Sequence, residues 1–590
     1  MRLLAILPFL CAATLAAQAP DTIYFHGDIL TGSHLRAGDT STTPARITAL
    51  AITNGKITAV GPDDAMLPLA DQHTEKIDLH GAFVMSGFND AHTHIASAGQ
   101  QRLTVDLDGT RSLAEMLQRI KDYTAKAAPG TWILGGGWDH TKWPSKTLPA
   151  RQDLDSVTAG HPAFLARTDG HIAVANTAAL TVAGVTAKTP DPSGGKFDHD
   201  AKGELTGIVR EGPARELIET HIPPPSPAVR RHALTIALDD AISHGVTSVQ
   251  DFSDWDDFLA LEAMEHDKEL HVRVSEWLTF GDPVDVLKQH QAHHPLDDPM
   301  LHTGMLKGFM DGSLGSRTAA LVAPYSDDAN NYGIARYTQK QLNKMTTERA
   351  IAGFQIGFHA IGDRANEMAL TAFDVAKAER MKTLEKLLPQ LEASTHASIT
   401  VSDTSRFRIE HAQVVAPKDF LLFSRLNIIA SMQPVHLLTD MAWATDRIGP
   451  ERARYSYAWK SFLDHGVTLA FGTDYPVESI NPFRGLYSAV TRQNEAGTQT
   501  FQPQEKLTLN EALYAYTQGS AFAETAEKKK GRLEPGFFAD LVVLDRDITK
   551  ASPQELLHTR VLRTVVAGQT VYTAPANTAE TPHRNVPDLD

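Results

Sequence analysis

The sequence predicts an α/β protein: a (β/α)8 barrel of the TIM type, a composite β-sandwich made from both chain ends, and a large insertion after the first barrel strand. Helix, glycine and apolar strand alternate repeatedly through the middle of the chain, which is typical of a parallel sheet. Short strand patterns stand at both ends. The 590 residues suffice for a barrel with insertions and one satellite domain.

Residues 1–19 have the composition of a secretory signal peptide. Arg2 precedes an apolar run from Leu3 to Ala17. A membrane anchor is the alternative, but this run is shorter than the about 20 apolar residues that cross a bilayer. We therefore expect export to the periplasm or the extracellular space, without a stable membrane anchor after cleavage. The only cysteine, Cys11, lies in this segment, so a metal site would use His, carboxylate or Lys.

Residues 20–81 and 532–580 predict the composite β-sandwich. The pair Asn54-Gly55 between two alternating strands indicates a hairpin, because both turn residues need positive φ. Ala567-Gly568 folds the last strands in the same way. The expected strands are Thr22–Phe25, Ile47–Ile52, Lys56–Val60, Ala539–Leu544 and Arg563–Tyr572. Strands at opposite chain ends can share one sandwich only if the middle of the chain folds as an inserted unit.

Residues 82–531 predict the barrel. Three amphipathic helices end at Gly245, Gly353 and Gly466, and each glycine is followed by an apolar strand. A Thr338/Gln341 capping box opens the second of these helices. The expected strands number eight, as a closed barrel requires. They are Phe83–Phe88, Val246–Gln250, Val272–Leu278, Gly304–Met310, Phe354–Phe358, Phe407–Ile409, Asn427–Met432 and Val467–Phe471.

Residues 95–229 form a long connection between the first and second barrel strands. It begins with a helix predicted over residues 112–127, where Ser112 and Glu115 form a capping box. A connection of this length is usually functional. We expect it to be a lid or binding subdomain.

The charge pattern argues against nucleic acid as a partner. The formal net charge is −16 and no basic stripe is present, so the groups that would neutralise phosphates are missing. The pair His293-His294 and the run Lys528–Lys530 are interpreted as solvated surface.

Candidate metal ligands follow the predicted strands. His92 and His94 stand two residues apart, which in extended backbone places both imidazoles on one face. The others lie in or just after later strands, and in a barrel all these strand ends open at one mouth. They are Lys307, His359, His411 and Asp474. Six such residues in register predict a metal site.

These motifs resemble the amidohydrolase superfamily, in particular its amidohydrolase-3 (YtcJ-like) branch, which includes N-substituted formamide deformylase-type enzymes. The resemblance runs through nearly the whole chain. Ser86 and Thr473 stand where proline and serine are common in that family. The matching stretches are Gly87-Phe88-Asn89-Asp90-Ala91-His92-Thr93-His94, Thr168-Asp169-Gly170-His171, Gly245-Val246-Thr247-Ser248-Val249, Lys307 with Asp311-Gly312-Ser313-Leu314-Gly315-Ser316-Arg317-Thr318, His359-Ala360-Ile361-Gly362-Asp363, Arg408-Ile409-Glu410-His411, Ser431-Met432-Gln433-Pro434 and Gly472-Thr473-Asp474-Tyr475-Pro476-Val477.

The resemblance implies one or two divalent metal ions, with zinc expected. His92 and His94 would hold the first ion together with Asp474, and His359 and His411 the second. Lys307 would bridge them as a carbamate, because an ammonium group cannot bind a cation. The alternative for Lys307 is an ion pair in the barrel, for instance with Asp311.

The implied activity is hydrolysis of a C–N bond in an amide, N-acyl, N-formyl or cyclic amide substrate by a metal-bound hydroxide. Asp474 would shuttle the proton, and His171 from the insertion would contact the substrate or stabilise the oxyanion. Further candidates for contact with a small-molecule substrate are Asp169, Trp138, Arg317, Gln433, His436 and Tyr475.

Two other functions remain open. The same metal chemistry could act on ester, carbamate or amidine substrates, because hydroxide attack does not itself choose the leaving group. An exported binding protein without turnover is the third hypothesis, and the presence of Asp474 argues against it. The sequence is compatible with a homo-oligomer and does not specify the substrate.

Overall fold

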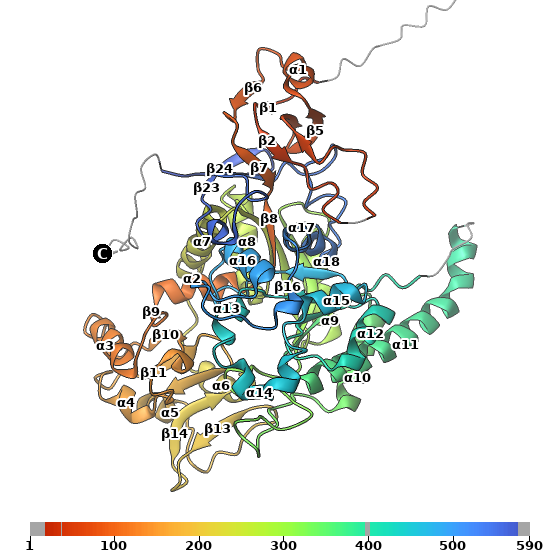
Figure 1. The fold of residues 1–590 in the computed structure, drawn as a ribbon. Coiled ribbons are helices and arrows are strands. Elements are labelled where there is room, and N and C mark those ends of the chain that lie inside the picture. Colours follow the sequence, from red (N-terminus) through yellow and green to blue (C-terminus); the bar gives the residue numbers. More distant parts are fainter. Residues whose placement is uncertain (1–17, 37, 396–401, 576–590) are drawn as a thin grey trace, which may run out of the picture.

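A parallel sheet of eight strands forms the centre of the computed structural model, which describes residues 18–36, 38–395 and 402–575 (Figure 1). Every neighbouring pair in this sheet is parallel. The strands are β8 (Phe88–Thr93), β15 (Val246–Asp251), β16 (Arg273–Thr279), β17 (Leu301–Phe309), β18 (Ile356–Ala360), β19 (Arg408–His411), β20 (Ile429–Met432) and β21 (Leu469–Phe471), in this order around the barrel. The predicted eight-stranded barrel is confirmed.

The barrel is nearly closed between its first and last strands. The backbone N–H of Asp474 donates to the carbonyl of His92 over 2.8 Å, and the N–H of His94 donates to the carbonyl of Tyr475 over 2.8 Å. These bonds join the chain after β21 to the end of β8. They also place two predicted ligand segments side by side.

The first barrel strand differs from the prediction. Phe83–Ser86 is a strand (β7) of another sheet, and the barrel strand β8 begins only at Phe88. Gly87 lies between them, where an added Cβ would meet the Thr247 side chain at 2.2 Å. The apolar run Phe83–Phe88 was predicted as one strand, because apolar periodicity does not reveal that its two parts belong to different sheets.

Helices cover the outside of the barrel. Helix α10 begins after the complete Thr338/Gln341 capping box, as predicted, and Gly353 follows it with φ of 97°. The main helices are α2 (Ile95–Leu103), α7 (Pro227–Ser243), α8 (Trp255–His266), α9 (Val284–His293), α10 (Gln339–Ile351), α11 (Asp363–Thr395), α12 (Phe420–Arg425), α14 (Ala444–Ala453), α15 (Trp459–Asp464) and α16 (Pro482–Thr491).

Two further sheets contain strands from the chain ends, seen as red and blue ribbons together at the top of Figure 1. Strand β22 pairs with β7, which joins C-terminal to N-terminal residues. The first sheet holds β5 (Lys56–Gly61), β4 (Ala49–Thr53), β1 (Thr22–Phe25) and β6 (Glu75–Asp78). The second holds β24 (Gln569–Thr573), β23 (Val561–Val566), β22 (Leu541–Leu544), β7, β2 (Asp28–Leu30) and β3 (Arg46–Ile47).

The alternation of side chains in β7 places these sheets against the barrel. Val84 packs with Leu50 and Leu541 in a core between the two sheets, whereas Phe83 and Met85 belong to the large core of the barrel. The domain limits drawn from the sequence stay a prediction.

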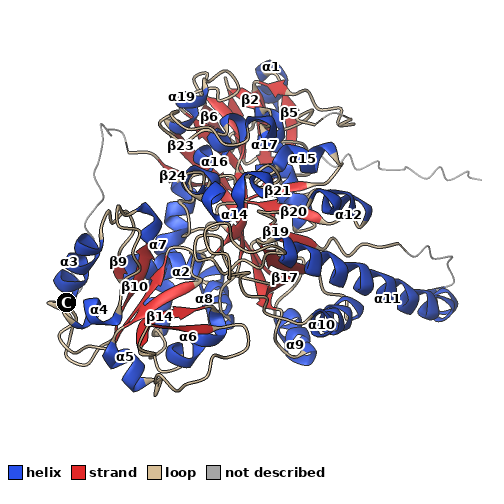
Figure 2. Ribbon diagram, turned by 60° about the horizontal axis from the view of Figure 1, so that its bottom comes forward, coloured by secondary structure: helices blue, strands red, loops and turns tan. Residues whose placement is uncertain are grey.

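Residues 95–229 contain a six-stranded sheet that the sequence analysis did not predict (Figure 2, red arrows). Its order is β13 (Lys196–His199), β14 (Leu205–Arg210), β12 (Ile172–Ala175), β11 (Ala163–Arg167), β10 (Ile133–Trp138) and β9 (Val105–Asp106). Helices α3 (Leu113–Thr124), α4 (Arg151–Asp155), α5 (Thr177–Val182) and α6 (Gly212–Glu219) flank it. Alternate residues of β11 and β12 fill separate cores on its two faces. Ser112 caps α3, as the sequence predicts.

Residues 1–17 of the predicted signal peptide lie outside the described residues. Across residues 18–36, 38–395 and 402–575, none of the helices combines the length and apolar character needed to cross a lipid bilayer.

Candidate metal centre

Six side chains meet at the C-terminal ends of the barrel strands. His92 lies in β8 and His94 follows it, Lys307 lies in β17, His359 in β18, His411 ends β19, and Asp474 follows β21. Asp474 Oδ1 is 3.1 Å from His94 Nε2 and 3.4 Å from His92 Nε2. The rings of His359 and His411 are 4.5 Å apart, and those of His92 and His411 are 4.9 Å apart. The structure therefore gathers all six predicted residues at one place.

Two of these residues adopt a backbone conformation that is unusual outside glycine. The φ angles are 71° at His411 and 60° at Asp474. Such residues concentrate at functional sites, where the surrounding structure holds them against their local preference. Here both residues with positive φ lie at or after the end of a strand, and both side chains lie in the cluster.

The hydrogen bonds of the histidines suit metal ligands. Nδ1 of His92 is 2.7 Å from Glu410 Oε2, that of His94 is 3.0 Å from the carbonyl of Phe252, and that of His411 is 2.7 Å from Gln433 Oε1. Each acceptor fixes the proton on Nδ1 and leaves a lone pair on Nε2. One donor atom from each of His92, His411 and Asp474 lies within 4.8 Å of the others. The residues present therefore fit a divalent metal ion.

Burial sets the protonation states of the cluster. Burial and the neighbouring Lys307 lower the pKa of His92 to about 4. Burial likewise holds the pKa values of His359 and His411 well below the ordinary histidine value. Burial alone would raise the pKa of Asp474, but the adjacent His92 and His94 hold it well below its usual range. At neutral pH these shifts favour neutral His92, His359 and His411 and an ionised Asp474, which are the ligand forms.

Lys307 lies in the same centre as a buried amine. Its Nζ is 2.9 Å from His92 Nε2, and it lies over the rings of Phe309 and Trp277 at 4.9 and 5.5 Å. Burial lowers the pKa of Lys307 to about 8. The alternative ion pair with Asp311 is wrong, because the oxygens of Asp311 accept the backbone N–H groups of Ala320, Ile361 and Gly362. No other carboxylate pairs with Lys307 within the described part of the chain.

Glu410 and Arg408 contact the cluster directly, and the sequence analysis gave neither of them a role. Glu410 is fully buried, accepts a hydrogen bond from Arg408 Nε over 2.5 Å and holds His92 through Nδ1. Two charged residues that alternate with the apolar Phe407 and Ile409 in a predicted strand were the available signal. Alternation puts them on one face, and a barrel strand has no solvated inner face.

Replacing Glu410 by Gln is expected to weaken metal binding about 10- to 100-fold, because the amide is a weaker acceptor for the His92 Nδ1–H. Competition with a chelator measures the affinity. Glu527→Gln removes the same charge from a partly exposed pair with Arg406 and should leave metal affinity unchanged. Equal affinities for wild type and Glu410→Gln would contradict a metal bound through His92.

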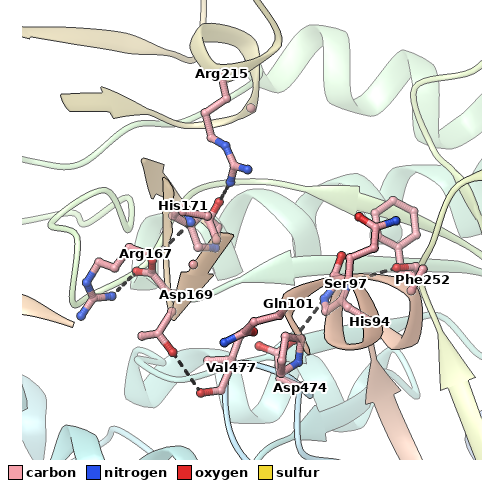
Figure 3. Close-up of a pocket in the computed structure, with 18 of the residues that line it drawn as sticks. His94, Ser97, Gln101, Arg167, Asp169, His171, Arg215, Phe252, Asp474 and Val477 are labelled. Carbon is pink, nitrogen blue, oxygen red and sulfur yellow. Dashed lines mark hydrogen bonds and ion pairs between the residues drawn. The ribbon is translucent and has the colours of Figure 1, made fainter. Parts of the chain in front are cut away.

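A cavity of about 570 Å³ opens above the cluster (Figure 3). His94, Lys307, His359, His411 and Asp474 line it on the barrel side. The insertion contributes its other wall, which includes residues 166–171 and the helix residue Arg215. Figure 3 shows Arg167, Asp169, His171 and Arg215 of the insertion on one side and His94 and Asp474 of the barrel on the other.

His171 and Asp169 reach the centre from the insertion, as predicted. The His171 ring is 4.9 Å from that of His359, and its Nδ1 is 3.0 Å from Glu211 Oε2. Burial alone would lower the pKa of His171, but the charge of Glu211 and its hydrogen bond raise it. Asp169 Oδ2 is 2.6 Å from Arg167 Nη1 and accepts a hydrogen bond from Ser316 Oγ over 2.7 Å. Asp169 therefore ties the insertion loop to the loop after β17.

His436 lines an adjoining cavity with His171, His411 and Asp474. Its Nε2 is buried, has no hydrogen-bond partner and lies 3.6 Å from Asp474 Oδ2. The structure therefore places this candidate where a bound molecule could reach it.

Four other candidates for substrate contact are not among the residues that line the two adjoining cavities, and their role stays a prediction. Trp138 is fully buried in the insertion, and its indole N–H donates to the Leu165 carbonyl over 2.9 Å. Arg317 pairs with Asp327 away from the cavity. Gln433 contacts His411 instead of the cavity, and the Tyr475 hydroxyl donates to Asp240 over 2.8 Å. Each of these side chains therefore has a hydrogen-bond partner outside the cavity lining.

The comparisons with known proteins agree with this geometry. The family model described as "Amidohydrolase family" (Amidohydro_3) matches residues 75–572. "Protein LONG AFTER FAR-RED 3" of Arabidopsis thaliana is 33% identical over 89% of this chain and 88% of its own. The Bacillus subtilis protein named "Putative amidohydrolase YtcJ" is 31% identical over 85% of this chain and 90% of its own. N-substituted formamide deformylase of Arthrobacter pascens is 25% identical over 89% and 94%.

A solved structure shares the fold. An uncharacterised metal-dependent hydrolase from Pyrococcus horikoshii superposes with a TM-score of 0.69 and 28% identity, over 90% of this chain and 99% of the other.

Proposed function

Because the chain belongs to the amidohydrolase family, we propose that it hydrolyses a C–N bond in an amide, with N-acyl, N-formyl or cyclic amides as the substrate class. The observation that carries this proposal is that His94, Lys307, His359, His411 and Asp474 line the floor of one cavity, with His92 buried beside His411 and Asp474. The relative named as an N-substituted formamide deformylase supports the N-formyl class.

The proposed ligands of the first metal ion are His92, His94 and Asp474, and those of the second are His359 and His411. We propose Lys307 as a bridge between them: its neutral amine adds to CO2 and loses one proton, which gives a carbamate with two donor oxygens. Zinc is the proposed metal, bound as one or two ions. Bound there, it would polarise the substrate carbonyl and supply hydroxide at neutral pH by lowering the pKa of water.

Asp474 is the proposed proton carrier. Its carboxylate is ionised at neutral pH and lines the cavity, so it is placed to accept a proton from water as the C–O bond forms. It then gives that proton to the nitrogen as the C–N bond breaks, because an amide nitrogen leaves poorly as an anion. A single carboxylate thus serves both proton transfers.

His171 is the proposed donor to the substrate oxygen. Glu211 Oε2 holds its Nδ1, and Arg336 Nη2 donates to the same oxygen over 2.8 Å, so the ring orientation is fixed before substrate binds. A donor that is already oriented stabilises the developing negative charge without reorganisation during the reaction.

Replacing His171 by Asn is expected to lower kcat/KM about 10²- to 10³-fold, because one oriented donor is lost. Metal content, measured by plasma mass spectrometry, should stay the same. His161→Asn changes a partly exposed histidine of the same insertion and should leave both quantities unchanged. Loss of metal in His171→Asn, or unchanged turnover, would argue against this role.

A matched substrate series tests the reaction class. Purified protein of known metal content is assayed with N-formyl amines, N-acyl amines and lactams, and with the corresponding esters, carbamates and amidines. Higher kcat/KM on the amides supports amide hydrolysis. Higher kcat/KM on the esters, carbamates or amidines would instead identify that class as the substrate. A metal-loaded protein that turns over none of them would favour an exported binding protein.

We also propose that the chain is exported. The composition of residues 1–19 supports this. Expression of the full chain in a Gram-negative host, followed by fractionation and N-terminal sequencing, tests it: a periplasmic product cleaved near residue 19 is expected, and an uncleaved product in the cytoplasm would refute export.

A further inference from the structure

A second group of metal-ligand side chains lies on the outside of the barrel. Glu265 is in the last turn of α8, His294 follows α9, and Asp298 is in the loop that leads to β17. One donor atom from each of the three lies within 4.8 Å of the others. Asp254 and Asp257, near the start of α8, line the catalytic cavity, and Glu265 lies about 12 Å further along the same helix.

His294 has the least exposed side chain of this group. Its side chain is only 10% exposed, and its ring packs edge-on against Phe258. The sequence predicted a solvated surface at His293-His294, and this is wrong for His294. A nine-tenths buried imidazole needs partners for both nitrogens, or else a ligand.

The two ring nitrogens of His294 differ in their hydrogen-bond partners. Nδ1 is 2.9 Å from Glu262 Oε1, so this nitrogen carries the proton in the neutral ring. Nε2 is buried, has no hydrogen-bond partner, and lies 3.5 Å from Glu265 Oε2 and 3.8 Å from Asp298 Oδ2. A carboxylate on one ring nitrogen and a free lone pair on the other is the arrangement that orients histidine ligands of metal ions.

Apart from His294, the two carboxylates have no basic partner among the described residues. Lys and Arg side chains form no ion pair with Glu265 or Asp298 within the described part of the chain. A divalent ion would satisfy both carboxylates and the lone pair of His294 at once.

We propose that Glu265, His294 and Asp298 bind a divalent transition-metal ion, with water completing its coordination. One imidazole nitrogen and two carboxylate oxygens are donors that Zn²⁺ accepts, and the imidazole favours it over Mg²⁺ or Ca²⁺. The ion ties the C-terminal end of α8 to the segment that enters β17, the strand that carries Lys307. The site is therefore a structural clamp, and it does not depend on the proposed hydrolytic activity.

Two variants remove ligands of this site, and a third is the matched control. His294→Gln and Glu265→Gln should each hold about one metal ion fewer per chain than wild type after dialysis against a weak chelator, as measured by plasma mass spectrometry. Their hydrolytic activity should be retained. His293→Gln changes the neighbouring histidine, which is 42% exposed and pairs with Glu262, and should keep the wild-type metal count.

Thermal unfolding gives an independent measurement. After complete metal removal, added Zn²⁺ should raise the Tm of both proteins. The rise should be at least about 2 °C smaller for Glu265→Gln than for wild type, because the variant has lost one binding site. Equal metal counts and equal Zn²⁺-induced shifts in wild type and both ligand variants would overturn the proposal. So would a Kd for Zn²⁺ at this site weaker than about 100 μM, which would indicate adventitious binding. If His294→Gln does not fold, the Glu265→Gln comparison decides alone.

Discussion

Replacing Asp474 by Asn is expected to lower kcat/KM about 10³- to 10⁴-fold in a protein that remains folded. Asn has nearly the same shape, and the backbone N–H of residue 474 can still donate to the His92 carbonyl, so the closure of the barrel is preserved. The amide cannot accept a proton at neutral pH, however, and it is a weaker ligand than a carboxylate. Loss of general acid–base catalysis in both steps accounts for the size of the effect.

Steady-state kinetics on the best substrate, together with metal analysis, tests this prediction. Asp327→Asn is the control, because it makes the same change in a carboxylate that pairs with Arg317 and Arg447 outside the cavity. Wild-type kcat/KM in Asp474→Asn would remove this residue from the mechanism. A large loss in the control would show that the assay reports folding and not chemistry.

Replacing Lys307 by Gln or Arg is expected to lower kcat/KM about 10³-fold and to reduce the bound metal by about one ion per chain. Neither side chain can form a carbamate, so the proposed bridge is lost, with several kcal/mol of stabilisation of the transition state. Arg keeps the positive charge, which separates loss of the carbamate from loss of charge. The wild-type protein prepared in ¹³C-bicarbonate should show a carbamate resonance by ¹³C NMR, and both variants should lack it.

Lys377→Gln controls for the removal of a buried lysine. Lys377 is 8% exposed and pairs with Asp403 away from the metal centre. This variant should keep its metal and its kcat/KM, even if its Tm falls. Full metal content and activity in Lys307→Gln would rule out the bridge, and a wild-type protein without the carbamate resonance would show that the lysine acts unmodified.

The elements with strong local signals could be predicted from the sequence. Gly353 ends α10, and the Asn54-Gly55 turn joins β4 to β5. These features depend on a few neighbouring residues, because capping bonds and positive φ are local properties. The apolar run around Gly87 was interpreted as one strand, since periodicity does not distinguish two strands that lie in different sheets.

The sheet in the insertion had no comparable local signal. Its strands are short, and β9 is formed by only Val105–Asp106. Their pairing depends on contacts across residues 105–210, so the sequence indicated a functional connection without its architecture. Glu211, which orients His171, was missed for the same reason, because its partners come from 40 and 125 residues away.

By itself, the sequence determined the order of the eight barrel strands and the residue types at their ends, because strand periodicity and helix ends are encoded within a few positions. Only the tertiary structure decided which side chains face the cavity. Trp138 is buried in a core of the insertion, His436 lies close to Asp474, and Nε2 of His294 lies beside two carboxylates without a hydrogen-bond partner among the described residues. The direction of a side chain depends on packing partners that are distant along the chain, and no local pattern records them.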